Sequence, residues 1–249
     1  MGVIYVLWIR QLKRYLRSKT RIIGSLGQPL LFLIALGFGF GPIYAKAGGG
    51  DYIQFLAPGI IAMSIIFTAT FMGIEIIWDR QFGFLKETLV APVSRFKIMI
   101  GRTLGGATVA VLQGVVVLLL SLLAGFRPVD IWMLPLALVF MALIALMFTA
   151  FGTALASRME DMHGFQLIIN FLIMPLFFLS GAIFPLNSGV PKAIDIVAKL
   201  NPLTYGVDGL RDTLVFSVNT GTAFNLIVLS AVTLVFLLIG SFLFSKLQV

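Results

Sequence analysis

The 249-residue sequence contains no cysteine and only one histidine. Without cysteine the chain can form no disulfide, no haem thioether link and no thiolate metal site. One histidine cannot supply the two that an H-E-x-x-H zinc site needs, so we interpret His163 as a solvated or helix-end residue. The few acidic residues are scattered, and a carboxylate-rich metal site is not indicated. The N-x-S/T glycosylation pattern is also absent, which mildly favours a prokaryotic source.

Sequence motifs for catalysis are missing as well. No lysine follows a glycine, so the phosphate-binding G-x-x-x-x-G-K-[ST] loop does not occur. G-x-S-x-G, the nucleophile motif of many hydrolases, is also absent. We therefore predict that the chain is not an enzyme and binds no cofactor of its own.

Charged residues are scarce, at 11% of the chain, whereas hydrophobic residues make up 59% and the mean hydropathy is +1.06. Ordinary globular domains carry about 25% charged residues, so this composition predicts an all-α integral membrane protein. The net charge of +8 does not indicate a nucleic-acid partner, because the basic residues flank long apolar runs, as the positive-inside rule expects.

Six apolar stretches are long enough to cross about 30 Å of hydrocarbon. We place them near residues 22–44, 53–78, 98–125, 131–156, 165–184 and 222–245. Residues 1–249 are then one transmembrane domain, in which 22–184 carries spans one to five. Gly101 and Gly105 give the third stretch a small-xxx-small edge suited to close helix packing. Met174-Pro175 should kink the fifth.

Lysine and arginine positions predict the orientation. Thirteen of them fall on the side of the N-terminal segment and of the 79–102 loop, against five on the other side. We expect both termini in the cytoplasm of a multi-pass cell-membrane protein, and the segment 185–221 outside.

Residues 1–21 are predicted to form an amphipathic helix at the membrane surface. One face carries Ile4, Tyr5, Trp8, Leu12, Tyr15 and Leu16, and the opposite face carries Arg10, Lys13, Arg14, Arg17 and Arg21. This pattern is typical of a helix in the headgroup region. A cleaved signal peptide is the rival interpretation, since Ala45-Lys46-Ala47 resembles a cleavage site. We reject it because the charged region and the apolar run are both too long.

The stretch Ile74–Arg102 is the one long charged interruption between the apolar runs. A short helix fits Gln81–Val90, because Pro92 disfavours helical geometry at the residue before it, and Ser94 is a candidate N-cap for a helix starting at Arg95. Its apolar side chains either lie on the bilayer surface or are covered by a protein partner. Neighbouring features favour the partner.

Glu75 stands out as a carboxylate at or near membrane depth, which marks a functional hypothesis. The simpler alternative is that it reaches the interface or pairs with Arg80. In the segment 185–221, Pro191–Leu200 and Tyr205–Val215 both read as short helices separated by Asn201-Pro202. Asp208 and Arg211 are spaced i, i+3, which supports the second helix.

Two blocks of the sequence resemble a known family. The first is E-x-x-x-D-R-Q-F-G-F-L-K-E-T-L-V-A-P-V-S-R from Glu75. The second is P-L-F-F-L-S-G-A-I-F-P-L-N-S-G-V-P from Pro175, followed by N-P-L-T-Y-G-V-D-G-L-R from Asn201. Together they are similar to the membrane subunits of type-2 ATP-binding-cassette exporters, nearest the drug- and lipid-exporting branch. The outer motif residues are Pro175, Ser180, Gly181, Phe184, Pro185, Asn201, Pro202, Tyr205, Asp208 and Arg211.

The resemblance implies a permease that pairs with a second copy or a close paralogue and binds two separate ATPase subunits, which hold ATP and magnesium. The loop after the second span would dock on the ATPase through Phe82, Gly83, Phe84, Leu85, Lys86 and Glu87. The N-terminal helix would contact the ATPase as well as membrane lipids, and an outer helical hairpin would cap the exit. The cargo would be amphipathic, drug-like or lipid-linked. The alternatives are a membrane-embedded enzyme of lipid or cell-wall metabolism, or an energy-independent channel or scaffold.

Overall fold

The computed structural model describes residues 2–48, 50–90, 92–186, 191–215 and 221–247. The described residues form helices and no strand. The helices are α1 (Gly2–Arg17), α2 (Lys19–Lys46), α3 (Tyr52–Phe71), α4 (Ile74–Gln81), α5 (Phe84–Val90), α6 (Arg95–Leu123), the 3-10 turn η1 (Ile131–Met133), α7 (Leu134–Ala156), α8 (Met162–Phe178), α9 (Lys192–Leu200), α10 (Pro202–Val215) and α11 (Thr222–Ser245).

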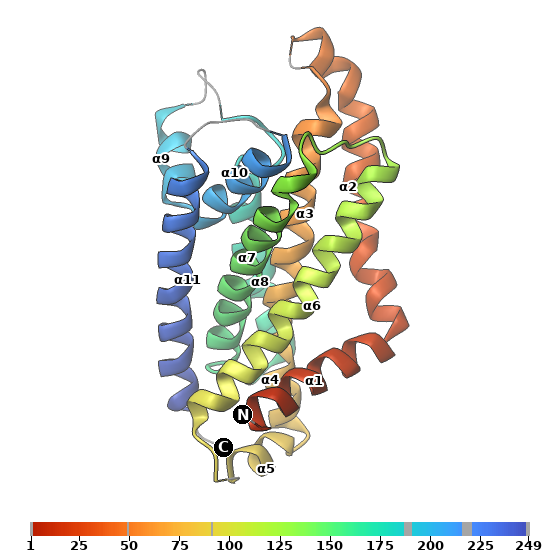
Figure 1. Ribbon diagram of the computed structural model, residues 1–249. Coiled ribbons are helices and arrows are strands. Elements are labelled where there is room, and N and C mark those ends of the chain that lie inside the picture. Colours follow the sequence, from red (N-terminus) through yellow and green to blue (C-terminus); the bar gives the residue numbers. More distant parts are fainter. Residues whose placement is uncertain (1, 49, 91, 187–190, 216–220, 248–249) are drawn as a thin grey trace.

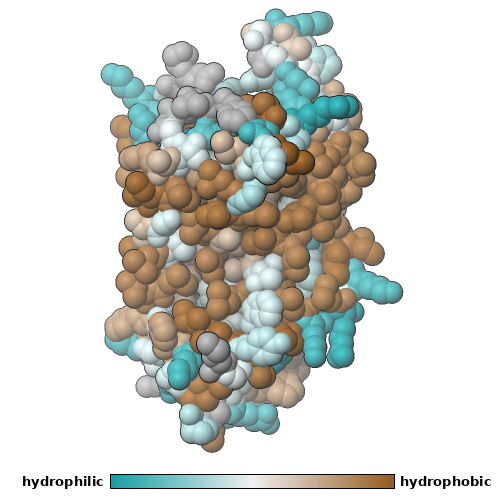
Figure 2. All heavy atoms as spheres, viewed as in Figure 1, coloured by the Kyte–Doolittle hydropathy of each residue, from teal (hydrophilic) through white to brown (hydrophobic). Residues whose placement is uncertain are grey.

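The long helices run side by side in one bundle, and α3 lies at its centre (Figure 1). Most of α3 is buried, because α2, α6, α7 and α10 all pack against it. On the face shown in Figure 2, hydrophobic residues form a band across the middle of the molecule, and hydrophilic side chains gather at both ends. This distribution agrees with the predicted integral membrane class.

Among the residues that the structure describes, five segments are long and apolar enough to cross a membrane: Lys19–Lys46, Tyr52–Gln81, Arg95–Leu123, Ile131–Ala156 and Thr222–Ser245. The predicted fifth stretch, 165–184, differs from the structure, because its helix α8 runs from Met162 to Phe178. It starts early because the Asp161 carboxylate accepts hydrogen bonds from the backbone N–H groups of His163 and Gly164, at 3.2 and 2.6 Å. Beyond Phe178 the chain turns, and Gly181 adopts a φ of +74°. The 17-residue helix is shorter than the other five segments.

The boundary between the N-terminal amphipathic helix and the first apolar helix also lies earlier than predicted. The amphipathic helix ends at Arg17, and α2 begins at Lys19 rather than at residue 22. Ser18 leaves helical geometry, with φ −96° and ψ 78°, so α1 and α2 meet at an angle (Figure 1). The N-cap prediction is confirmed, since the Ser94 side chain accepts from the backbone N–H of Lys97 and α6 starts at Arg95.

Two backbones touch where α3 ends and α4 begins. A Cβ added to Gly73 would lie 2.3 Å from the carbonyl oxygen of Gly152 in α7, and one added to Gly152 would lie 2.3 Å from the carbonyl oxygen of Thr70. No real Cβ tolerates such distances, so only glycine permits this contact. The α3–α4 junction is therefore seated directly on α7.

The segment 185–221 contains the two predicted short helices. They are α9 and α10, with Asn201 between them, and α10 starts at Pro202, three residues before the predicted start. Residues 187–190 and 216–220 lie outside the described residues. Helices α9 and α10 occupy the end of the bundle opposite α5, whereas α1 and the C-terminal end of α11 lie at the α5 end (Figure 1).

Candidate functional site

The predicted helix 81–90 is divided in two. Gly83 adopts a φ of +79°, a left-handed conformation that glycine accepts without strain. Consequently α4 ends at Gln81 and α5 begins at Phe84. The glycine between two phenylalanines was the signal for this break, and the prediction of one continuous helix missed it.

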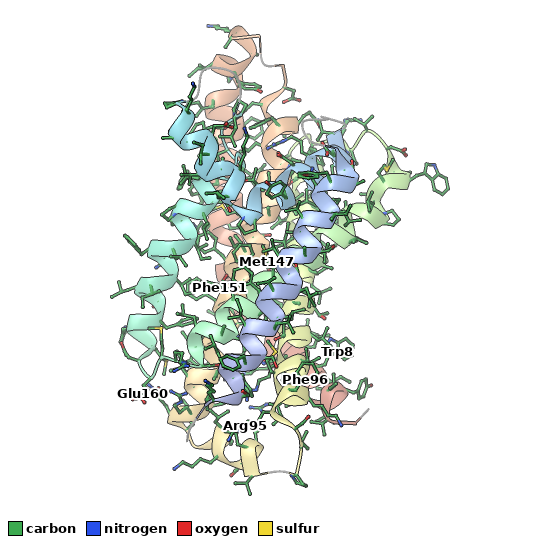
Figure 3. The ribbon with its side chains drawn as sticks, turned by 90° about the vertical axis from the view of Figure 1, so that its left-hand side faces the viewer. Trp8, Arg95, Phe96, Met147, Phe151 and Glu160 are labelled. Atoms are coloured by element: carbon green, nitrogen blue, oxygen red, sulfur yellow. The ribbon has the colours of Figure 1, made fainter. Side chains whose placement is uncertain are left out.

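Helix α5 and Phe82, two residues before it, expose most of their side chains at the end of the bundle. Phe82 is 71% exposed, Phe84 54% and Val90 84%, and Lys86 and Glu87 are also exposed. We call these five residues the α5 surface. The α6 start adds Phe96, which sequence reasoning missed and which is 56% exposed. Arg95, Phe96 and Glu160 all lie at this end (Figure 3).

Leu85 differs from its neighbours on α5. Its side chain is fully buried and belongs to the hydrophobic core of the bundle. The prediction that the apolar side chains of this stretch lie on the bilayer surface or under a protein partner is therefore wrong for Leu85. Leu85, with the partly buried Leu89, holds α5 against the rest of the protein and leaves the two phenylalanines outside.

The turn between α7 and α8 is hydrogen-bonded to side chains of α4. Arg80 donates to the carbonyl oxygens of Met159 and Ser157, at 3.1 and 3.2 Å. Gln81 donates to the carbonyl oxygen of Glu160 at 3.2 Å. Arg80 therefore donates its hydrogen bonds to backbone carbonyls. It does not pair with Glu75, as one alternative from the sequence had it.

Glu75 and Asp79 lie one turn apart on α4, and both are nearly inaccessible, with side chains 3% and 4% exposed. Glu75 forms an ion pair with Arg21 of α2 at 2.9 Å. Asp79 pairs with Arg10 of α1 at 3.1 Å and with Arg102 of α6. Two buried carboxylates on α4 therefore connect to three other helices. We call this set of side chains, together with Arg14, the α4 ion network.

Helix α1 packs on α6 through the glycine edge predicted from the sequence. A Cβ on Gly101 would lie 3.0 Å from Leu7 Cβ, and one on Gly105 would lie 2.7 Å from Gln11 Cβ. Trp8 Nε1 donates to Thr108 Oγ1 at 2.9 Å.

The face that α1 packs against the bundle coincides only in part with the predicted apolar face, to which Tyr15 belongs. Leu7, Gln11 and Tyr15 are buried, whereas Tyr5 and Leu16, both assigned to the apolar face, are 58% exposed. The buried face is set by the glycine edge of α6 rather than by the apolar stripe alone.

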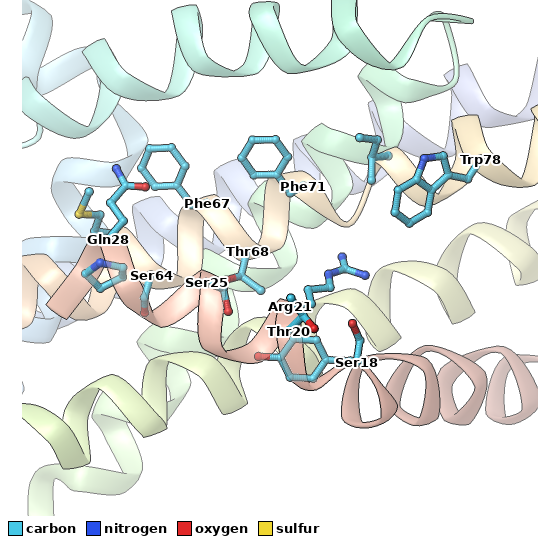
Figure 4. A pocket seen from close by; sticks show the side chains of 15 residues that line it. Ser18, Thr20, Arg21, Ser25, Gln28, Ser64, Phe67, Thr68, Phe71 and Trp78 are labelled. Carbon is cyan, nitrogen blue, oxygen red and sulfur yellow. The ribbon is translucent and has the colours of Figure 1, made fainter. Parts of the chain in front are cut away.

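A cavity of about 620 Å³ opens between α2 and the α3–α4 segment (Figure 4). Its polar side chains include Ser18, Thr20, Arg21, Ser25 and Gln28, mainly from α2, with Ser64 and Thr68 from α3. Its apolar side chains include Met63, Phe67, Phe71 and Trp78. This cavity could not be predicted from the sequence, because its two walls come from separate helices.

Two of the other outer motif residues, Asp208 and Gly181, contact Arg211. Its guanidinium pairs with Asp208 at 3.2 Å, donates to the Gly181 carbonyl at 3.1 Å and lies over the ring of Phe55, 4.1 Å from the centroid. The predicted pairing of Asp208 and Arg211 is thus present. Asn201 donates to the Leu176 carbonyl at 2.6 Å, which ties the start of α10 to α8.

Of the other motif positions, Tyr205 and Ser180 form hydrogen bonds within the protein, whereas Phe184 and Pro175 are exposed. Tyr205 donates to the Lys199 carbonyl at 2.8 Å, and Ser180 donates to the Phe177 carbonyl at 2.7 Å. Phe184 is 52% exposed, and Pro175 lies on the exposed side of α8.

Asp208 lies beside a second cavity, of about 640 Å³, whose lining includes Arg211, Lys199, Asp195 and Tyr205. Burial raises the pKa of Asp208 to about 6, the nearby Asp212 also raises it, and Arg211 opposes both. This carboxyl group therefore changes charge within an accessible pH range. In the described part of the chain, no three His, Cys, Asp or Glu side chains are grouped to hold a metal ion.

Comparison with known proteins completes the description of the site. A model of the ABC-2 type transporter family matches residues 2–215. The ycf38 transport permease of Cyanophora paradoxa is 31% identical over 258 aligned positions, covering 95% of this chain and 84% of that protein. Nodulation protein J of Rhizobium meliloti is 32% identical, covering 82% and 79%. Nodulation protein J of Rhizobium leguminosarum bv. viciae is 30% identical, covering 78% and 74%.

Proposed function

Because this chain belongs to the ABC-2 type transporter family, and is therefore a transmembrane transporter subunit, we propose that it exports an amphipathic, drug-like or lipid-linked substrate from the cytoplasm. Membership of the family implies an ABC transporter system with a partner ATPase. In our proposal two ATPase subunits bind ATP and magnesium, and a second copy of the permease or a close paralogue completes the complex. The complex would lie in the cell membrane of a prokaryote.

The observation that carries the proposal is the α5 surface. Two exposed phenylalanines, Phe84 on α5 and Phe82 just before it, lie beside a lysine and a glutamate on a short helix whose Leu85 is buried. Covering aromatic side chains of about 150–250 Å² each at about 25 cal/mol per Å² gives several kcal/mol before binding costs. Lys86 and Glu87 would set orientation and encounter rate more than affinity. Movement of the ATPase would reach the bundle through α5 and α4.

The amphipathic substrate is supported by the cavity between α2 and α3 (Figure 4). Hydroxyl, amide and guanidinium groups line it together with aromatic and aliphatic groups, and both helices contribute polar side chains. A molecule with a polar head and an apolar body can contact both kinds of group, whereas a wholly polar solute would leave the aromatic side chains without a partner.

The proposed topology has six spans, with both termini in the cytoplasm. Helix α8 would be the sixth crossing segment. Its 17 residues lie at the lower limit for a transmembrane helix. The α5 end of the bundle would then be cytoplasmic, and α9 and α10 would be outside.

The experiment is co-purification of the cognate ATPase with Phe84→Ala. We expect the variant to insert at wild-type abundance, because Phe84 is exposed and contributes little to folding. It should lose most of the bound ATPase and stop export, because the proposed docking surface loses an aromatic side chain. Trp132→Ala is the matched control, since Trp132 is 86% exposed and follows α6 at the opposite end. If Phe84→Ala retains the ATPase and transports normally, the docking assignment is wrong.

A further inference from the structure

The α4 ion network contains more positive than negative charge. Four guanidinium groups surround two carboxylates: Arg10, Arg14, Arg21 and Arg102 against Glu75 and Asp79. The short contacts to the acids come from Arg10, Arg21 and Arg102. Arg14 lies 3.7 Å from Glu75 and 3.8 Å from Asp79, which is longer than a hydrogen bond. An anion beside Arg14 would therefore improve the local charge balance.

A groove of about 600 Å³ on α1 offers a place for such an anion. It is lined by Val6, Ile9, Arg10, Lys13, Arg14 and Arg17. Four of these six residues are basic, and none is acidic. Arg10 and Arg14 belong to both the groove and the network, and their side chains are 40% and 38% exposed. The groove is therefore a cationic surface whose inner edge connects to the buried acids of α4.

The position of the groove favours a lipid over a free anion. Helix α2, a candidate membrane span, starts two residues after α1 ends. Figure 2 shows long hydrophilic side chains projecting from the region of α1, immediately beside the hydrophobic band. Val6 and Ile9 add apolar contacts next to the bases, which a phosphate ion could not use but the glycerol and upper acyl carbons of a lipid could.

We propose that the groove on α1 is a binding site for the headgroup of an anionic phospholipid. The phosphate would sit among Lys13, Arg14 and Arg17 and supply the negative charge that the network lacks. Because Arg14 and Arg10 also face Glu75 and Asp79, an occupied groove would stabilise the association of α1 with α4. This inference does not depend on what the protein transports or on any ATPase. The lipid site can therefore be disproved while the proposed function stands, and the proposed function can be disproved while the lipid site stands.

The test uses the full chain purified in a neutral detergent. Phosphatidylglycerol, phosphatidylcholine or inorganic phosphate is added, and two quantities are measured: lipid adducts by native mass spectrometry and the thermal unfolding midpoint. We expect phosphatidylglycerol to bind and raise the midpoint, and the other two to have little effect at the same phosphate concentration. An equal effect of inorganic phosphate would overturn the lipid assignment, and equal binding of phosphatidylcholine would overturn the need for an anionic headgroup.

The groove variant is Lys13→Gln/Arg17→Gln, because neither residue forms an ion pair within the described residues. Each basic residue near an anionic lipid contributes about fivefold in affinity, so the double variant should weaken phosphatidylglycerol binding by about 30-fold. Lys46→Gln/Lys192→Gln removes the same charge at the opposite end and should bind normally. Arg17→Lys retains the charge and should also bind. Equal phosphatidylglycerol affinity of the groove variant and the control would overturn the site.

Discussion

Asp79 provides the sharpest test of the α4 ion network. Its carboxylate contacts Arg102, and both side chains are only 4% exposed. Within the described residues, Nε and Nη1 of Arg102 are buried without a hydrogen-bond partner. Asp79→Asn would leave that guanidinium with no adjacent carboxylate. Removing one member of a buried ion pair typically costs about 3–5 kcal/mol, and we expect the lower end of this range because the amide oxygen of asparagine can still accept one hydrogen bond.

The assay is the free energy of unfolding in mixed detergent micelles, followed by circular dichroism. A double-mutant cycle with Arg102→Met isolates the interaction. Since replacing both partners removes the unpaired charge, the double variant should recover a large part of the stability that Asp79→Asn loses. Asp195→Asn is the control, because Asp195 and its partner Lys199 are 45% and 71% exposed and such surface pairs contribute about 0.3–0.5 kcal/mol.

Two results would refute this reasoning. The first is a loss below about 1 kcal/mol for Asp79→Asn, as expected for a surface pair. The second is strict additivity of the two single changes, because residues in direct contact within one network should couple. Either result would mean that Asp79 is hydrated and that α4 is held by other contacts.

Four further predictions follow from the same structure. Leu85→Ala should cost about 2–5 kcal/mol of unfolding free energy, since its side chain is fully buried; a cost near zero would contradict the burial. Glu75→Gln should slow transport more than it lowers membrane abundance, and unchanged transport would leave Glu75 a purely structural residue. Because the pKa of Asp208 is raised from 3.8 to about 6, the folded state binds this proton more tightly than the unfolded state, and the free energy of unfolding should fall as pH rises from about 4 to 6. Asp208→Asn should remove this fall, and an unchanged dependence of the unfolding free energy on pH would refute the prediction. Cysteines introduced at positions 18 and 94 of this cysteine-free chain should not be labelled by an impermeant thiol reagent in intact cells. Labelling of either position from outside would show that the predicted orientation is wrong.

The features that could be predicted from the sequence are local ones. The Ser94 N-cap, the pairing of Asp208 with Arg211 and the two short helices around Asn201 each depend on residues a few positions apart. The Gly101 and Gly105 edge was also recognisable, although the sequence did not reveal that α1 is its partner. The membrane class followed from composition alone.

Long-range contacts could not be predicted in the same way. Arg21 and Glu75 are 54 positions apart, and no periodicity connects them, so Arg80 was the nearer candidate. The burial of Leu85 depends on how α5 folds back on the bundle. The cavity of Figure 4 requires the relative placement of α2 and α3. Each of these depends on packing between helices, which a single sequence does not encode in any short pattern.

The contact between Gly73 and Gly152 has a mechanical consequence. Side chains at a helix interface can change rotamer and let two helices slide, whereas two backbones in direct contact have no such freedom. The junction of α3 and α4 therefore resists translation along α7, and a force applied at α5 would turn α4 about this point. Glu75 and Asp79 lie on the turning segment, so rotation would change their distances to arginines on three other helices together. The two glycines thus define a pivot, and α4 is the lever arm that it supports.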